Sequence, residues 1–172
     1  MIRPVNIEDA SQLAEIYNFY ILNTIVTFEA ELIDETEMRS RIRSNTSKFP
    51  WIVYEKDVEL LGYAYAGEWN SRYAYKNTVE STIYLKDTAT NKGIGFLLYQ
   101  FLINQLKEMR FHAIIGGISL PNPASVALHE KCGFEKVAHY KEVGYKFDRW
   151  IDVGYWELLV TENDSYLKPN TL

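Results

Sequence analysis

The chain has 172 residues, 47% of them hydrophobic, which is enough for one domain with a sizeable core. Its formal net charge of −5 disfavours nucleic acid and anionic membranes as partners. The one cysteine, Cys132, cannot form an internal disulfide, and no apolar run approaches membrane-spanning length. Because no signal-peptide core follows Met1, the sequence predicts a cytoplasmic protein.

Periodicity and turn residues divide the chain into eleven expected elements. In chain order these are a strand at 2–5, helices at 6–23 and 34–49, strands at 51–54, 60–69 and 79–85, a helix from about 94 to 110, a strand at 112–118, a helix at 124–132, and strands at 134–143 and 150–160. This order predicts one α/β domain over residues 1–160, with a mixed sheet flanked by helices. Residues 161–172 are expected to form a polar tail.

Local signals mark several boundaries. Asn6 can cap a helix, and Asp34 with Glu37 three residues later is typical of a capping box. Gly133 suits a helix end. Residues 119–123, which contain two prolines, are expected to turn.

The strongest ligand signal is the loop Thr90-Asn91-Lys92-Gly93-Ile94-Gly95, which leads from a strand into a helix. Glycines let backbone N–H groups approach a ligand, and a helix N-terminus favours phosphate. The alternative is that both glycines only make a tight turn. The loop lacks the Gly-Lys-Ser/Thr ending of a nucleotide triphosphatase, and Leu98 replaces the third glycine of the dinucleotide pattern.

The strand before this loop has one polar face, formed by Thr78, Glu80, Thr82 and Tyr84. Such a row is consistent with the lining of a cleft, in which Glu80 is a candidate general base. The alternative is an ordinary solvated carboxylate on a strand. In the strand at 112–118, the Gly116-Gly117 pair predicts a bulge or close approach to the backbone.

With these features in place, the chain resembles the GNAT superfamily of acetyl-coenzyme A-dependent N-acetyltransferases over nearly its whole length. The superfamily loop reads Gln/Arg-x-x-Gly-x-Gly/Ala, and Thr90 stands where Gln or Arg is usual. A second signature, Asn-x-x-(small)-x-x-Leu-Tyr-Glu-Lys-x-Gly-Phe, matches residues 122–134, with His129 in place of Tyr. The resemblance implies the GNAT fold, whose central sheet is mostly antiparallel.

Within the superfamily, the chain is similar to the phosphinothricin and methionine sulfoximine acetyltransferase branch. The matching pieces are residues 65–69 with Arg72 and Tyr75, residues 78–84, residues 128–130, and residues 144–147 with Trp150 and Asp152. This implies acetylation of the α-amine of a small amino acid that carries a phosphinate, sulfoximine or sulfone, and implies a homodimer.

The resemblance also assigns roles to residues. Glu80 is the expected general base, and His129 lies near the thioester, where imidazole can act as acid or base. The expected coenzyme contacts are Ile83, Tyr84, Leu85, Thr90, Asn91, Lys92, Gly93, Ile94, Gly95, Phe96, Asn122 and Ser125. The expected acceptor contacts are Phe28, Arg72 and Tyr75. No metal is expected, because the three histidines lack the spacing of metal ligands.

Two other functions are compatible with the sequence. One is acetylation of a different amine, such as a polyamine, an aminoglycoside or a protein N-terminus, although Arg72 disfavours cationic acceptors. The other is a non-catalytic module that binds acetyl-coenzyme A, which Glu80 and His129 disfavour.

Overall fold

Seven strands form one sheet, in the order β1-β2-β3-β4-β5-β7-β6, in the computed structural model, which describes residues 1–160. The strands are β1 (Ile2–Pro4), β2 (Trp51–Lys56), β3 (Glu59–Glu68), β4 (Thr78–Leu85), β5 (Ala113–Leu120), β6 (Glu135–Lys146) and β7 (Arg149–Leu159). The helices are α1 (Ala10–Asn23), α2 (Glu35–Thr46), α3 (Ile94–Glu108) and α4 (Pro123–Lys131). The expected tail at 161–172 lies outside the described residues.

The predicted order of strands and helices is confirmed, and so is the mixed sheet. Five of its six strand pairs are antiparallel, and only β4 and β5 run parallel. No helix of the described residues is long and apolar enough to cross a membrane.

Some boundaries differ from those predicted. Strand β5 continues through Ser119 to Leu120, where we expected a turn, because Leu120 stays in register with Asp152 of β7. The turn between β6 and β7 is also shorter than expected. Its two turn residues, Phe147 and Asp148, have φ angles of 53° and 56°. Two consecutive positive φ angles suit a two-residue hairpin turn.

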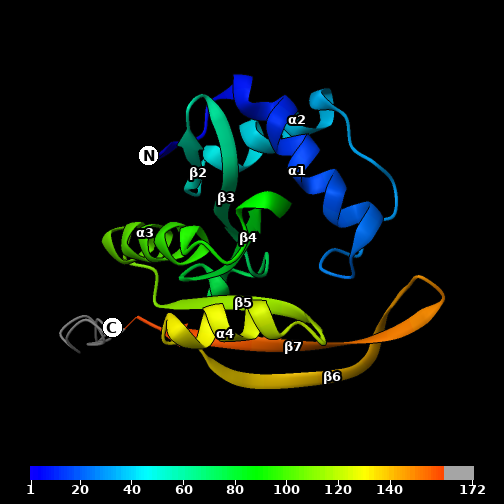
Figure 1. Cartoon of the computed structure of the whole chain (residues 1–172). Helices are drawn as coiled ribbons and strands as arrows, with labels where there is room; N and C mark the ends of the chain where they lie inside the picture. Colours follow the sequence, from blue (N-terminus) through cyan, green and yellow to red (C-terminus); the bar gives the residue numbers. More distant parts are fainter. Residues whose placement is uncertain (161–172) are drawn as a thin grey trace.

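Helices cover both faces of the sheet (Figure 1). One core cluster contains the buried face of α3, and the other contains the buried faces of α1 and α2. Strand β2 shows why both faces are apolar. Ile52 belongs to the α3 cluster, whereas Trp51 and Val53 belong to the α1–α2 cluster. Alternate side chains of a strand point to opposite faces, so β2 is buried on both faces.

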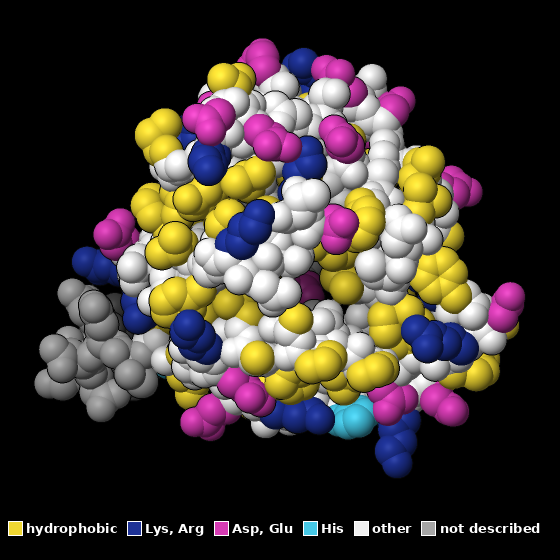
Figure 2. Space-filling model, viewed as in Figure 1, with side chains coloured by type: hydrophobic (Ala, Val, Ile, Leu, Met, Phe, Trp, Pro, Cys, Tyr) yellow, Lys and Arg dark blue, Asp and Glu magenta, His cyan; other side chains and the backbone are white. Residues whose placement is uncertain are grey.

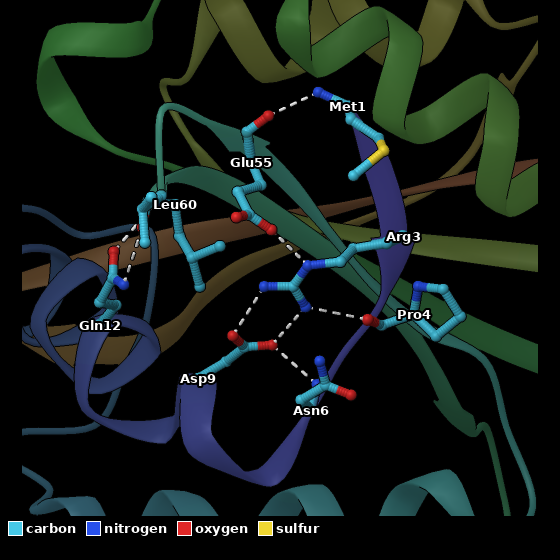
Figure 3. A network of polar contacts seen from close by, with 9 residues as sticks. Met1, Arg3, Pro4, Asn6, Asp9, Gln12, Glu55 and Leu60 are labelled. Atoms are coloured by element: carbon cyan, nitrogen blue, oxygen red, sulfur yellow. Dashed lines mark hydrogen bonds and ion pairs between the residues drawn. The ribbon is translucent and has the colours of Figure 1, made fainter.

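A polar network fixes the N-terminal strand to the start of α1 (Figure 3). The Arg3 guanidinium holds Asp9 bidentately at 2.8 and 2.9 Å and also contacts Glu55 of β2. Burial is the largest influence on the pKa of Asp9 and raises it, but the hydrogen bonds from Arg3 and the Asn6 N–H, together with the Arg3 charge, outweigh burial, so the pKa lies below its ordinary value. Gln12 extends the network by accepting a 2.9 Å hydrogen bond from the backbone N–H of Leu60. These residues line neither of the cavities described below.

Candidate active site

The site begins where the two parallel strands separate. Strands β4 and β5 pair only from Thr78 with Ala113 to Glu80 with Ile115. Beyond this point β4 stays with β3, and β5 stays with β7. In Figure 1 the two halves of the sheet run in different directions at this place. Diverging strand ends of this kind are where sheets of α/β proteins bind ligands.

Two adjoining cavities, of about 240 and 440 Å³, open at the divergence. The smaller is lined by Val26, Thr27, Phe28, Glu80, Ser81, Thr82, Ile83, Tyr84, Gly117, Ile118, Ser119, Asn122, Ser125 and His129. The larger is lined by Val26, Phe28, Glu80, Gly117, Ser119, Tyr140, Val143, Val153 and Tyr155. Figure 2 shows a hollow near the centre of the molecule with acidic atoms at its floor. Among the lining residues of both cavities, Glu80 is the only acidic one.

Glu80 borders both cavities and is largely shielded from water. Burial raises the pKa of its carboxyl group above the ordinary value. None of the hydrogen bonds found among the described residues reaches this carboxylate, so nothing offsets the cost of burying its charge. A carboxylate with a raised pKa is a stronger base, and one at a cavity junction can reach an incoming amine.

His129 lies on the opposite face of the sheet and is only 4% exposed. Its Nδ1 is 2.8 Å from the carbonyl oxygen of Ser125, which can only accept, so Nδ1 carries the proton. The unprotonated Nε2 accepts a 2.8 Å hydrogen bond from the Tyr99 hydroxyl, which lies 2.6 Å from Ser81 Oγ. Burial lowers the pKa of His129, so the imidazole is neutral near pH 7.

The predicted close approach at Gly116 and Gly117 is confirmed for both residues. A Cβ atom on Gly116 would lie 2.4 Å from His129 Nε2. One on Gly117 would lie 3.2 Å from both Glu80 Oε1 and Tyr155 Cε1. Successive residues of β5 therefore make room for His129 on one face and Glu80 on the other.

The loop before α3 has the geometry expected of an anion site. Asn91 and Gly93 have φ angles of 58° and 77°, and the conformation of Gly93 favours glycine. Nothing lies within 4 Å of the position that a Gly93 side chain would take, so the loop is open there. The first N–H groups of α3 have no acceptor within the helix. This loop fits the phosphates of a coenzyme.

Gly95 lies where the start of α3 meets the end of β4 and α4. A Cβ atom here would meet Leu85 Cδ1 at 3.3 Å and Leu128 Cδ2 at 3.5 Å. The start of α3 therefore packs closely against the end of β4 and against α4. Asn122 caps α4 by accepting a 3.1 Å hydrogen bond from the Ser125 N–H, and both residues line the smaller cavity.

The structure brings together part of the predicted site. Seven predicted residues line the smaller cavity, namely Phe28, Glu80, Ile83, Tyr84, Asn122, Ser125 and His129. Leu85 ends β4, and residues 90–96 form the loop before α3 and the first residues of α3. Arg72 and Tyr75 lie on an exposed loop and line neither cavity. Their contact with an acceptor stays a prediction.

Sequence reasoning missed the wall of the larger cavity that β6 and β7 provide. Tyr155 makes edge-to-face contacts with Tyr140 at 5.7 Å and with Trp69 at 5.4 Å between ring centroids. Val143 and Val153 complete this wall. Val153 and Tyr155, at alternate positions of β7, were the available signal, but alternation alone does not say which face meets a cavity.

The loop between α1 and α2 (residues 24–34) closes the cavities from the other side. The buried Lys146 of β6 donates a 2.8 Å hydrogen bond to the carbonyl oxygen of Thr27. The ring of Phe28 lies where a side chain of Gly144 would be, 2.3 Å from that position. These contacts hold Phe28 at the junction of the cavities, and its contact with an acceptor stays a prediction.

Comparison with known proteins identifies the class. The family model described as "Acetyltransferase (GNAT) domain" matches residues 2–154. The chain belongs to this family and is an N-acetyltransferase, and the family takes its acetyl group from acetyl-coenzyme A. Among residues 1–160, no group of three or more His, Cys, Asp or Glu side chains could hold a metal ion.

Several relatives within this family have more specific names. The phosphinothricin N-acetyltransferase of Streptomyces coelicolor is 36% identical over 160 residues, 91% of this chain and 94% of the relative. The L-methionine sulfoximine/L-methionine sulfone acetyltransferase of Salmonella typhimurium is 30% identical, over 90% of this chain and 91% of the relative. A phosphinothricin acetyltransferase from Sinorhizobium meliloti, solved in complex with acetyl-coenzyme A, superposes with a TM-score of 0.90 at 32% identity, covering 100% of this chain and 97% of that one.

Proposed function

We propose that the protein transfers the acetyl group of acetyl-coenzyme A to the α-amine of a small amino acid with a phosphinate, sulfoximine or sulfone side chain. The observation that carries this proposal is the position of Glu80, a carboxylate of raised pKa at the junction of two cavities. The names of the relatives at 30–36% identity support the acceptor class. Such acetylation would protect a cell from toxic amino acids of this kind.

The acetyl donor is proposed to lie along the smaller cavity and the start of α3. Its phosphates would meet the N–H groups of residues 91–96, with Thr90 and Lys92 beside them. Its pantetheine arm would follow Ile83–Leu85, since the backbone of β4 has no partner strand on the β5 side after Glu80. Asn122 and Ser125 would border the opposite side of this arm.

The acceptor is proposed to occupy the larger cavity. Glu80 takes a proton from the ammonium group, and the neutral amine then attacks the thioester carbon. Because Nε2 of the neutral imidazole accepts from Tyr99, we propose that His129 takes, through the hydroxyls of Ser81 and Tyr99, the proton that the attacking nitrogen loses as the amide forms. The carbon–sulfur bond breaks, and the imidazolium returns this proton by the same route to the leaving thiolate. Burial raises the pKa of Tyr99, so this phenol keeps its proton at neutral pH.

The remaining assignments are proposals of the same kind. Arg72 and Tyr75 would contact the acidic group of the acceptor if the loop at 70–77 moved over the cavity. Residues 1–160 are proposed to form a single catalytic domain, because one sheet runs through them. The buried free thiol of Cys132 supports a reducing compartment such as the cytoplasm.

A homodimer is proposed from the exposed apolar side chains of the β6–β7 hairpin. These are Val137, Tyr140, Val143, Tyr145, Phe147 and Trp150, each at least 51% exposed. Exposed patches of this kind mark interaction sites. Tyr140 and Val143 also line the larger cavity, so a second copy on this face would cover the acceptor.

A thiol-release screen tests the proposed function. Purified protein is given acetyl-coenzyme A and, in turn, the standard amino acids, phosphinothricin, methionine sulfoximine, methionine sulfone, spermidine and kanamycin. We expect the fastest release with a phosphinate, sulfoximine or sulfone amino acid. Faster thiol release with spermidine or kanamycin would show that the preferred acceptor is a different kind of amine. Binding of acetyl-coenzyme A without release in any reaction would contradict catalysis.

A further inference from the structure

Ser119 carries a buried hydroxyl without a hydrogen-bond partner among the described residues. The residue is 7% exposed, and its Oγ atom is shielded from solvent. Three other buried side-chain atoms among the described residues also lack a hydrogen-bond partner. They belong to Asn45, Trp51 and Gln105, which line neither cavity. Leaving a buried hydroxyl unpaired costs free energy, so native proteins rarely keep one without a use.

The hydroxyl lies on the same side of the sheet as Glu80. Alternation along β5 places Ser119 on the face of Gly117, and a Cβ atom on Gly117 would lie 3.2 Å from Glu80 Oε1. Five residues border both cavities, namely Val26, Phe28, Glu80, Gly117 and Ser119. Only Glu80 and Ser119 among them have polar side chains. The residues Glu80 and Ser119 therefore border the place where donor and acceptor are proposed to meet.

We propose that Ser119 is a positioning residue whose hydroxyl, by rotation about χ1, turns from its shielded position into the cavity and accepts a hydrogen bond from the α-amino group of the acceptor. This inference rests on the proposed function. An amine that has lost one proton to Glu80 keeps two N–H groups, and its lone pair must point at the thioester carbon. One N–H held by Ser119 limits rotation about the Cα–N bond, and orienting a nucleophile in this way lowers the barrier.

Ser119→Ala and Ser119→Thr test this role, with Ser44→Ala as a control on an exposed face of α2. The acceptor is the one that wild-type protein turns over fastest in the screen. We expect Ser119→Ala to lower kcat/KM about tenfold, the size of one lost hydrogen bond, and Ser119→Thr to recover most of it. The Kd for acetyl-coenzyme A, measured by calorimetry, stays unchanged.

The melting temperature separates this role from a structural one. Because Ser119→Ala removes an unpaired buried hydroxyl, its Tm should equal or exceed that of the wild type. Three results for Ser119→Ala would each overturn this inference but leave the proposed function standing. They are a wild-type kcat/KM, a lower Tm together with the lost activity, and weaker binding of acetyl-coenzyme A. A wild-type protein that acetylates none of the acceptors overturns the proposed function and this inference with it.

Discussion

At the scale of single residues, the site depends on a carboxylate held where burial makes its ionisation unfavourable. Glu80 has no hydrogen-bond donor among the described residues, and burial raises its pKa. Such strain is typical of residues kept for chemistry rather than for stability. Arg3 and Asp9 show the contrast, since Asp9 is held ionised by a bidentate partner and borders no cavity.

Glu80→Gln should therefore stabilise the fold at neutral pH. The folded-state pKa of Glu80 lies above its unfolded value, so ionisation costs stability as the pH rises from the unfolded pKa through the folded one. The amide avoids this cost and should raise Tm at pH 7.5, by about 2–4 °C for each kcal/mol. The advantage should disappear near pH 3, well below the ordinary value of 4.5, where the wild-type carboxyl is protonated in both states. Thermal melts at the two pH values check this, and a lower Tm for the variant at pH 7.5 would refute it.

Arg72 tests whether the exposed loop takes part in acceptor binding. If its guanidinium meets the acidic group of the acceptor, Arg72→Ala should raise KM about tenfold or more and leave the Kd for acetyl-coenzyme A unchanged. Lys76→Ala removes a cation from the same loop and serves as the control. Steady-state kinetics with varied acceptor measure both, and an unchanged KM would place Arg72 outside the site.

At the scale of elements, β5 is the strand that both faces of the site share. Its consecutive glycines admit His129 from one face and Glu80 with Tyr155 from the other. A side chain at Gly116 would collide with an imidazole held by two hydrogen bonds. A side chain at Gly117 would meet Glu80 at a distance that a small shift relieves. The two positions should therefore respond differently to substitution.

Gly117→Ala should fold but lose activity. The added methyl group displaces the Glu80 carboxylate, and misplacing a catalytic group by as much as about 1 Å can cost on the order of 100-fold in rate. We expect kcat/KM to fall at least tenfold. Gly67→Ala, at the residue that pairs with Glu80 across β3 and β4, is the comparison, because its new methyl group would meet only Asn45 Nδ2, at 4.0 Å. Wild-type activity in Gly117→Ala would show that Gly117 does not set the position of Glu80.

At the scale of the whole molecule, the order of the elements was predictable, and much of the site was not. Polar and apolar alternation marked β4, and Gly93 marked the start of α3. The contact between Lys146 and Thr27 joins residues 119 positions apart, and the packing of Phe28 on Gly144 is similarly remote. Such contacts leave no periodic signal, so the wall of the larger cavity could not be predicted. The buried, unpaired hydroxyl of Ser119 could not be predicted, because β5 was expected to end before this residue.

The β6–β7 hairpin leads to a prediction about assembly. Tyr145 and Trp150 form an exposed edge-to-face pair, with ring centroids 4.9 Å apart. If this face joins two copies, Trp150→Glu should convert a dimer into a monomer, because a carboxylate would be buried without a partner. Leu22→Glu, at an exposed position of α1, should stay dimeric. Sedimentation velocity measures the mass, and a monomeric wild-type protein at micromolar concentration would contradict the proposal.

The central claim is that Glu80 removes the proton from the acceptor amine. The direct measurement is kcat/KM of Glu80→Gln for the preferred acceptor between pH 4 and 9, with the Kd for acetyl-coenzyme A as a control for folding. Loss of a general base should lower kcat/KM by about 10²–10⁴ with the Kd unchanged, and the pH limb due to the carboxylate should vanish, leaving the rise due to the amine. A variant with near wild-type kcat/KM at neutral pH would contradict the claim and assign proton removal to His129 or to water.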